Sequence, residues 1–391
     1  MMPMLMTYSL RSLWQRRRTT LATTLGIAMV VFVLCASRML AHGMRQTMTS
    51  AGSKDQALVM EHDIWAEQGS RIDQSNVGRV AAAPGVKRNG QGQAMVTGET
   101  VAHILLRGTR DPNRIGTVQV RGVSDNVLEL RPEARIIEGR MLVPGTDEAV
   151  VGKGLVGRYE GLSIGQDVAL ASKRKARVVG VFETGGSSYE SEVWSDLKLA
   201  QEALLAQGSV SSVTAQLESE SALDPFAETL TQDKQVGLSV ARESAYYDKV
   251  SGGVADVISI LGIIETVIFS FGAVLGAMIT MYASIAQRIP EIGVLRALGF
   301  SRRSILSAFL VESVALSLTG AAAGAGLALL TPALNFSTTN FATGQEVAFR
   351  FLPSFETLFA AVVAGCVIGV LSGVLPATRA SRISPTQAMR G

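Results

Sequence analysis

Four apolar stretches constrain this chain more than any other feature, because each is long enough to cross a lipid bilayer. A membrane-spanning α-helix needs about 20 apolar residues to traverse roughly 30 Å of hydrocarbon. The stretches are Leu21–Ser37, Val257 to about Ile285, Ser304 to about Ala333, and about Phe355 to Leu375. The sequence therefore predicts four transmembrane helices, with a long water-exposed segment between the first and the second.

The composition agrees with a chain that is divided between membrane and water. Of its 391 residues, 47% are apolar and 18% are charged, and the mean hydropathy is +0.28. Soluble proteins have a lower mean hydropathy, and chains that lie wholly in the bilayer have a higher one. These values exclude a simple cytosolic enzyme and a compact multi-span channel.

Charged residues beside the apolar stretches predict the orientation. Arginine is in excess in residues 1–20, in the link between the second and third stretches, and in the tail, whereas acidic residues outnumber basic ones over residues 44–253. The positive-inside rule therefore places both termini and the link in the cytoplasm. The net charge of +3 reflects this topology and needs no nucleic-acid partner. A cleaved signal peptide over residues 1–37 is disfavoured, because no small-x-small site ends it and Arg38 follows directly.

Residues 44–253 have short apolar runs broken by glycines, which is typical of a mixed α/β domain. Strands are predicted at Gln56–Met60, His103–Leu106, Val118–Val123, Ala149–Val151, Gln166–Ala171, Arg177–Phe182 and Val213–Leu217, and helices at Asp196–Gln207 and Pro225–Thr231. The helices of the first two spans are expected to continue into this domain as a stalk. Both cysteines, Cys35 and Cys366, lie in predicted spans, so we expect no disulfide in the domain.

No catalytic or metal-binding motif is found in this domain. None of the three histidines has metal-ligand spacing to another: His42, His62 and His103. Gly152-Lys-Gly154 lacks the hydroxyl residue and the glycine spacing of a phosphate-binding loop. We therefore expect no catalytic residue, no cofactor and no metal in this chain. The acidic residues are dispersed, and we expect them on a solvated surface.

The link between the second and third stretches predicts a short amphipathic helix. From residue 287 it reads Gln-Arg-Ile-Pro-Glu-Ile-Gly-Val-Leu-Arg-Ala-Leu-Gly-Phe-Ser. Pro290 suits the first turn of a helix and Glu291 its positive end. Gly299 can end the helix, and Ser301 can cap the next one. An apolar stripe follows at Ile292, Leu295 and Leu298. This stripe must be buried against another protein or against the membrane surface.

Three segments together resemble the FtsX/MacB-type permeases of ABC transporters. They are this link, the N-terminal Ser9-Leu-Arg-Ser-Leu-Trp-Gln-Arg-Arg-Arg18, and the C-terminal Pro376-Ala-Thr-Arg-Ala-Ser-Arg-Ile-Ser-Pro385. The family's periplasmic domain is similar to the stretches Glu138-Gly-Arg140, Glu148-Ala-Val-Val-Gly152 and Arg177-Val-Val-Gly-Val-Phe182. The resemblance covers nearly the whole chain, and the link is its most specific part.

The resemblance implies a membrane α-helical fold with four transmembrane helices and one large mixed α/β periplasmic domain between helices 1 and 2. The expected segments are a cytoplasmic amphipathic elbow helix (1–20), helix 1 and the start of the stalk (21–43), the periplasmic domain (44–253), the stalk and helix 2 (254–286), a cytoplasmic coupling helix (287–303), helix 3 (304–333), a short periplasmic loop (334–353), helix 4 (354–377) and a cytoplasmic tail (378–391). The implied location is the bacterial inner membrane.

The resemblance also assigns roles to residues. The coupling helix is implied to contact a separate ATP-binding subunit through Pro290, Glu291, Ile292, Gly293, Leu295, Arg296, Ala297, Leu298 and Gly299. Two acids within the spans, Glu265 and Glu312, are costly in hydrocarbon, which suggests a function for each. Neither is expected to be a proton relay, and the resemblance favours a structural or coupling role for Glu312. Glycines at helix-packing spacing serve either packing within one subunit or dimerisation: Gly272, Gly276, Gly320, Gly324, Gly365, Gly369 and Gly373.

The implied function is that of a non-catalytic permease subunit. ATP and magnesium would bind the partner ATPase, and a second permease copy or a paralogue would complete the membrane part. We favour export with a periplasmic adaptor and an outer-membrane channel. Release of lipoproteins from the membrane, or transmission of a signal that activates an envelope hydrolase, remains open. A receptor without any ATPase partner is a further alternative, and the cargo is not specified.

Overall fold

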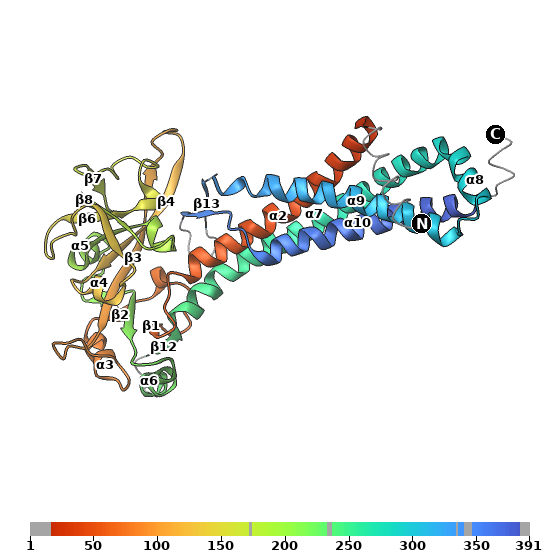
Figure 1. Cartoon of the computed structure of the whole chain (residues 1–391). Coiled ribbons are helices and arrows are strands. Elements are labelled where there is room, and N and C mark those ends of the chain that lie inside the picture. Colours follow the sequence, from red (N-terminus) through yellow and green to blue (C-terminus); the bar gives the residue numbers. More distant parts are fainter. Residues whose placement is uncertain (1–16, 172–173, 233–236, 334, 340–345, 384–391) are drawn as a thin grey trace. The chain divides into compact units, whose positions relative to one another are not determined.

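The computed structural model describes residues 17–171, 174–232, 237–333, 335–339 and 346–383. They belong to two compact units. The helical unit takes its residues from Met1–His42, Asp256–Leu334 and Phe351–Gly391, and the α/β unit takes them from Gly43–Ala255 and Asn335–Arg350. Figure 1 labels the elements of both units.

Four helices in the described part of the chain are long and apolar enough to cross a membrane. They are α2 (Arg17–Thr49), α7 (Glu243–Gln287), α9 (Arg302–Ala328) and α10 (Phe355–Ser381). The prediction of four spans is therefore confirmed. The short helix α8 (Ile289–Ala297) lies between α7 and α9. Of the predicted elbow helix, only residues 17–20 are described, and they begin α2; the tail is described up to residue 383.

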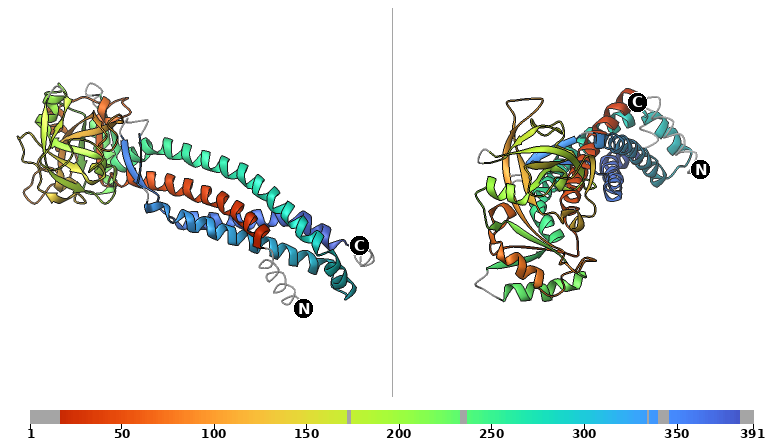
Figure 2. Two further views of the ribbon diagram at one scale, coloured as in Figure 1. Left: turned by 90° about the horizontal axis from the view of Figure 1, so that it is seen from above. Right: turned by 90° about the vertical axis from the view of Figure 1, so that its left-hand side faces the viewer.

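Glycines allow close contact between three helices of the helical unit, which lie side by side in Figures 1 and 2. On α9, a Cβ atom added at Gly320 would lie 2.9 Å from the Cβ of Ile27 in α2. On α10, a Cβ added at Gly369 would lie 2.8 Å from the Cα of Val314 in α9. The same closeness is found for Gly324 against α2, and for Gly365 and Gly373 against α9. These five glycines pack helices within one chain.

A ten-stranded sheet forms the α/β unit. In spatial order its strands are β12 (Leu238–Arg242), β1 (Gln56–Glu61), β11 (Ser212–Gln216), β3 (Val96–Arg107), β4 (Ile115–Val123), β9 (Glu192–Asp196), β6 (Glu148–Gly152), β8 (Lys175–Glu183) and β5 (Arg135–Gly139), while β7 (Asp167–Ala169) pairs with β8. The β4–β9 and β6–β8 pairs are parallel. Every predicted strand overlaps one of these strands, so the mixed α/β prediction is confirmed.

Short helices and a small two-stranded sheet complete the unit. They are α3 (Ser75–Ala82), α4 (Val127–Leu130), α5 (Leu197–Ala203), α6 (Leu223–Thr231), β2 (Ile72–Asp73) and β10 (Ser209–Val210). Asp196 caps α5, because its carboxylate accepts hydrogen bonds from the backbone N–H groups of Lys198 (2.9 Å) and Leu199 (3.3 Å). The helix is shorter than the predicted 196–207, since Leu205 adopts a positive φ of 54°.

A hairpin lies between α9 and α10 in the sequence. Its strands are β13 (Asn335–Thr339) and β14 (Glu346–Arg350), which pair antiparallel. The sequence predicted only a short loop over residues 334–353. The described residues of the hairpin belong to the α/β unit, so the chain enters that unit a second time after the third span.

Candidate functional site

Helix α8 has the boundaries that its sequence predicts. Pro290 and Glu291 lie in its first turn. At its end, Gly299 adopts a φ of +90°, and the N–H of Phe300 donates to the carbonyl oxygen of Leu295 at 3.2 Å. This is the hydrogen-bond pattern of a glycine-terminated helix. The structure thus has a short helix here, with Pro290 in its first turn and Gly299 after its end, as the sequence predicts.

The turn from α8 into α9 is fixed by side chains as well as by backbone. Ser301 caps α9, because its Oγ accepts from the N–H of Ser304 at 3.1 Å, as predicted. Arg296 donates through Nη1 to the carbonyl oxygen of Phe300 at 2.9 Å. Arg296 thus stabilises the turn itself, in addition to the contact role that the sequence implied.

A buried ion pair joins the beginning of α8 to α9. Arg288, the residue before α8, places Nη1 3.1 Å from Oε2 of Glu312. Its Nε lies 3.4 Å from Glu291, and its guanidinium lies 5.4 Å from the ring centre of Phe309. Arg288 is 6% exposed and Glu312 is 4% exposed. The costly acid of the third span therefore has a cationic partner from the link.

Sequence reasoning selected Glu312 but missed Arg288. The two residues are 24 positions apart and belong to different elements. The sequence signal for this ion pair was an acid inside an apolar span together with an arginine directly before a short helix. Nothing in the sequence alone tells which of the four link arginines turns inward.

The outer face of α8 is apolar. Ile292, which is 2% exposed, packs with Ile285 and Phe309 inside the helical unit. Val294 and Leu298 are instead 53% and 68% exposed. The predicted stripe of Ile292, Leu295 and Leu298 is thus divided between an inner and an outer face. Of the nine implied contact residues, the exposed ones are Pro290, Glu291, Ala297, Leu298 and Gly299, while Leu295 and Arg296 are half-buried and Ile292 and Gly293 are buried.

Helix α7 is the least buried of the four spans, although Gly262 lies against Ser37 of α2 and the hydroxyl of Thr23 donates to that of Thr280 at 3.0 Å. Only 6% of its most apolar stretch is buried, against 39%, 44% and 33% for α2, α9 and α10. Glu265 is exposed on it, and no described residue forms a hydrogen bond or an ion pair with this acid. A Cβ added at Gly272 or Gly276 would meet no atom within 4 Å. These three predicted residues therefore have open surroundings within the described chain.

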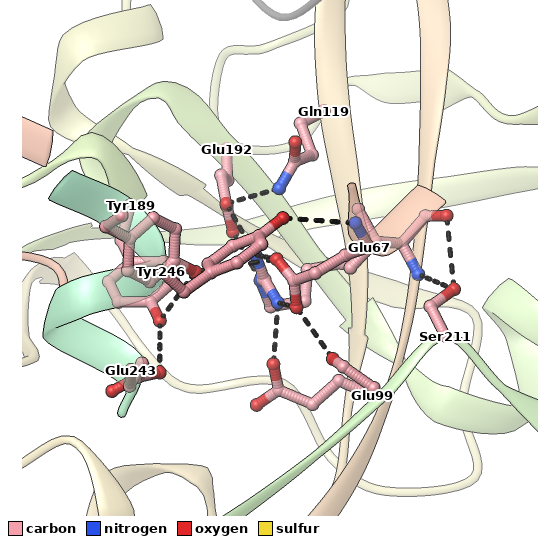
Figure 3. Close-up of polar contacts among 12 residues, drawn as sticks. Glu67, Glu99, Gln119, Tyr189, Glu192, Ser211, Glu243 and Tyr246 are labelled. Carbon is pink, nitrogen blue, oxygen red and sulfur yellow. Dashed lines mark hydrogen bonds and ion pairs between the residues drawn. The ribbon is translucent and has the colours of Figure 1, made fainter. Parts of the chain in front are cut away.

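A cluster of buried charges lies in the α/β unit, and Figure 3 shows it. The guanidinium of Arg121 in β4 is fully buried and contacts three carboxylates. Its Nη1 lies 3.0 Å from Glu67 and 2.7 Å from Glu99, and its Nε lies 2.8 Å from Glu192. Glu192 also accepts from the indole Nε1 of Trp194 at 3.0 Å.

A second buried guanidinium extends the cluster to the first residue of α7. Arg131 binds Glu99, with Nη2 3.0 Å from Oε2, and donates to the hydroxyl of Tyr189 at 3.1 Å. The same hydroxyl donates to Glu243 at 3.1 Å, whereas Arg131 is 3.9 Å from Glu243. The prediction that the acidic residues lie on a solvated surface is wrong for these four glutamates, because the buried guanidinium groups of Arg121 in β4 and Arg131 after α4 make their burial possible.

The pKa values of Glu99, Glu192 and Glu243 diverge, because these buried carboxylates share two guanidinium groups unequally. Burial alone would raise the pKa of Glu99, but Arg131 and Arg121 together hold it below its ordinary value. Burial raises the pKa of Glu192, and Arg121 offsets only part of this effect. Burial raises the pKa of Glu243 to about 7, because its cationic partner, Arg131, is distant. Glu243 therefore binds a proton near neutral pH.

The stability of the α/β unit is accordingly expected to increase as the pH falls from 8.5 to 6.5. An unfolded chain gives Glu243 a pKa near 4.3, so the folded state binds this proton more tightly, and the gain is about 1 kcal/mol over that interval. Thermal unfolding of the full chain at each pH measures it. Glu243→Gln should flatten this dependence and raise the unfolding midpoint at pH 8.5, whereas the exposed Glu133→Gln should do neither. An unchanged slope in Glu243→Gln would contradict the assignment.

Within the described residues, no group of three or more histidine, cysteine, aspartate or glutamate side chains is placed to hold a metal ion. The buried cluster is occupied by its own ion pairs and connects β3, β4, β9 and α7 with the turn at Glu67–Gly69. Its geometry therefore serves to hold the start of α7 in the α/β unit.

Two family models match this chain. The FtsX-like permease C-terminal model matches residues 263–385, and the MacB-like periplasmic core domain model matches residues 20–233. The second match covers more than half of the chain.

Curated relatives and solved structures show the same likeness. The uncharacterized ABC transporter permease YknZ of Bacillus subtilis is 31% identical over 160 residues, which are 41% of this chain and 37% of that protein. The macrolide export ATP-binding/permease protein MacB 2 of Aeromonas hydrophila is 30% identical over 272 residues, which are 66% of this chain and 39% of that protein. The chain thus spans about two fifths of the length of these relatives. The periplasmic region of MacB from Actinobacillus actinomycetemcomitans covers 50% of this chain and 92% of its own at 13% identity, with a TM-score of 0.37.

Proposed function

This chain belongs to the MacB/FtsX-like family of ABC transporter permeases, and we propose that it is the permease subunit through which a separate ATP-binding subunit moves the α/β unit. In this proposal ATP and magnesium bind the partner, and this chain is not itself an enzyme. Both termini and α8 lie in the cytoplasm of a bacterial cell, and the α/β unit lies in the periplasm. The positive-inside pattern of the arginines supports this orientation.

The outer face of α8 carries the proposal. Val294 and Leu298 are exposed one helical turn apart, on a helix held against α9 by the Arg288–Glu312 pair. A helix of nine residues is too short to span a bilayer. Its exposed apolar side chains therefore fit a groove on a protein partner, and the fixed turn at Gly299 would pass the partner's displacement to α9.

Replacing Val294 and Leu298 with serine is expected to remove the ATP-binding subunit from the purified chain. The double substitution removes the apolar contact and leaves the buried Ile292 in place. Purification of the tagged chain from native membranes in mild detergent, followed by mass spectrometry, measures the associated subunit. The control replaces Leu105 and Leu205, both 71% exposed in the α/β unit, with serine. Equal recovery of the subunit from both variants would overturn the α8 contact, and its absence from the wild-type chain would overturn the permease proposal.

Of the three processes that such a permease could drive, we propose export with a periplasmic adaptor and an outer-membrane channel. Several relatives are named as macrolide export proteins, which supports this choice. The same purification tests it, because an adaptor or channel protein should accompany the ATP-binding subunit. Lipoproteins or an envelope hydrolase in their place would favour lipoprotein release or signal transmission.

We also propose that two copies of the permease meet along α7. The open glycines and the exposed Glu265 support this, because an acid that faces lipid is costly and a second copy would shield it. Gly276→Cys is expected to form a disulfide-linked dimer in native membranes after mild oxidation, in a chain with both natural cysteines replaced by serine. Gly326→Cys on α9 is the matched control, because a Cβ there also meets no atom within 4 Å. Cross-linking through Gly326→Cys alone would place the interface elsewhere.

A further inference from the structure

One carboxylate fixes the hairpin β13–β14 to the rest of the α/β unit. Glu346, at the start of β14, is 5% exposed and accepts from three side chains. Nη2 of Arg114 lies 2.5 Å and Nη2 of Arg158 lies 2.6 Å from its Oε1, and the hydroxyl of Tyr159 donates to its Oε2. Arg114 precedes β4, and the other two follow the turn at Lys153–Leu155, so donors from two separate loops converge on Glu346.

The donors are themselves held in position. Tyr159 is 4% exposed, and its ring fills the space beside Gly116, where an added Cβ would lie 2.6 Å from the ring carbon Cζ. Burial, together with the hydrogen bond to Glu346, raises the pKa of Tyr159 to about 12, so it remains a proton donor at neutral pH. Two guanidinium groups and the held hydroxyl of Tyr159 therefore form a receptor for one carboxylate.

Two further contacts hold β14 in the α/β unit next to this receptor. Val347 is 3% exposed and packs in the same core cluster as Trp194. The N–H of Ala348 donates to Oγ of Ser191 at 3.1 Å. One strand thus inserts a charge, an apolar side chain and a backbone donor into the α/β unit, although the strand is joined through short connections to α9 and α10.

We propose that Glu346 anchors a mechanical link, separate from α2 and α7, that carries displacement of α9 and α10 into the α/β unit. The covalent path supports this, because the chain leaves the helical unit after α9, enters the α/β unit as the hairpin, and returns as α10. A hairpin that was only a connector would need no buried carboxylate with three donors. The inference rests on the proposed coupling to an ATP-binding subunit, and it makes Glu346 a positioning residue.

The test compares Glu346→Ala with the wild-type complex of full chain and ATP-binding subunit in nanodiscs. Hydrogen exchange is measured with and without ATP plus vanadate, at β14 to report docking of the hairpin and at β4 and β9 to report the response of the α/β unit. In the variant we expect rapid exchange at β14, continued ATP hydrolysis, and loss of most of the ATP-dependent change at β4 and β9. Glu148→Ala is the matched control, because Glu148 is a carboxylate paired with Arg140 elsewhere in the unit, and it should keep the full response.

A rescue separates docking of the hairpin from general stability. Ser191→Cys and Ala348→Cys, added to Glu346→Ala in a chain with both natural cysteines replaced by serine, should restore the ATP response under oxidising conditions and lose it again on reduction. A full response in Glu346→Ala, protection of β14 that persists without Glu346, or a disulfide that restores docking but not the response would each overturn the proposal. If Glu346→Ala does not fold, Glu346→Gln and Arg158→Ala take its place. A wild-type complex that lacks an ATP-binding subunit would instead overturn the proposed function.

Discussion

Arg121→Met is expected to lower the free energy of unfolding of the α/β unit by about 3 to 5 kcal/mol, because it leaves buried carboxylates without their cation. Arg121 is fully buried and contacts Glu67, Glu99 and Glu192 within 3.0 Å. Methionine preserves much of the side-chain volume, so the loss would come from electrostatics rather than from a cavity. Guanidinium unfolding of the full chain, followed by the fluorescence of the buried Trp194 with the other two tryptophans replaced, measures the change.

Two comparisons make this result specific. Arg135→Met removes an exposed ion pair with Glu183, and a change of no more than about 1 kcal/mol is expected. Adding Glu67→Gln and Glu192→Gln to Arg121→Met should recover part of the loss, since fewer buried charges remain. If Arg121→Met proved as stable as Arg135→Met, the cluster would not be held by its ion pairs.

Arg288→Met is expected to free α8 from the helical unit and, on the proposed function, to abolish association with an ATP-binding subunit. Without Arg288, the buried carboxylate of Glu312 loses the guanidinium that lies 3.1 Å from it, and breaking a buried ion pair costs about 3 to 5 kcal/mol. The readout is the rate at which a maleimide labels Ile292→Cys, which is protected in the wild-type background because Ile292 is 2% exposed. Labelling should become several-fold faster after Arg288→Met.

A double substitution tests whether the effect of Arg288→Met comes from the charge of Glu312. Arg288→Met combined with Glu312→Met removes both charges of the buried pair, so folding and slow labelling should return in large part. Arg302→Met is the control, because Arg302 is an exposed arginine of the same link. Equal labelling rates in Arg288→Met and Arg302→Met would show that the ion pair does not hold α8.

Local signals predicted the membrane part of the fold well. Apolar length identified the spans, and Gly299 and Ser301 marked the end of α8 and the start of α9 before any contact was known. These features depend on a few neighbouring residues, so they can be read from a single sequence. The strands β1, β4 and β8 were found for the same reason, because each is a compact apolar run.

Features that depend on distant partners could not be predicted in this way. Strand β9 is fully buried, yet Glu192, Ser195 and Asp196 give it a polar sequence, so it was missed. The four glutamates of the buried cluster looked like surface residues because their arginines are distant in the sequence and belong to other elements. The hairpin looked like a loop, since the partners of Glu346, Val347 and Ala348 in the α/β unit are all distant in the sequence.

The uneven covering of the four spans has a consequence for the lipids around this protein. Helices α2, α9 and α10 are joined through glycines, so their tilts are coupled, whereas only 6% of the most apolar stretch of α7 is buried. The candidate span of α7 has 32 residues, about 48 Å of helix, which exceeds the roughly 30 Å of hydrocarbon. Hydrophobic mismatch therefore acts first on α7, and a change in acyl-chain length would alter its tilt before it disturbs the other three helices.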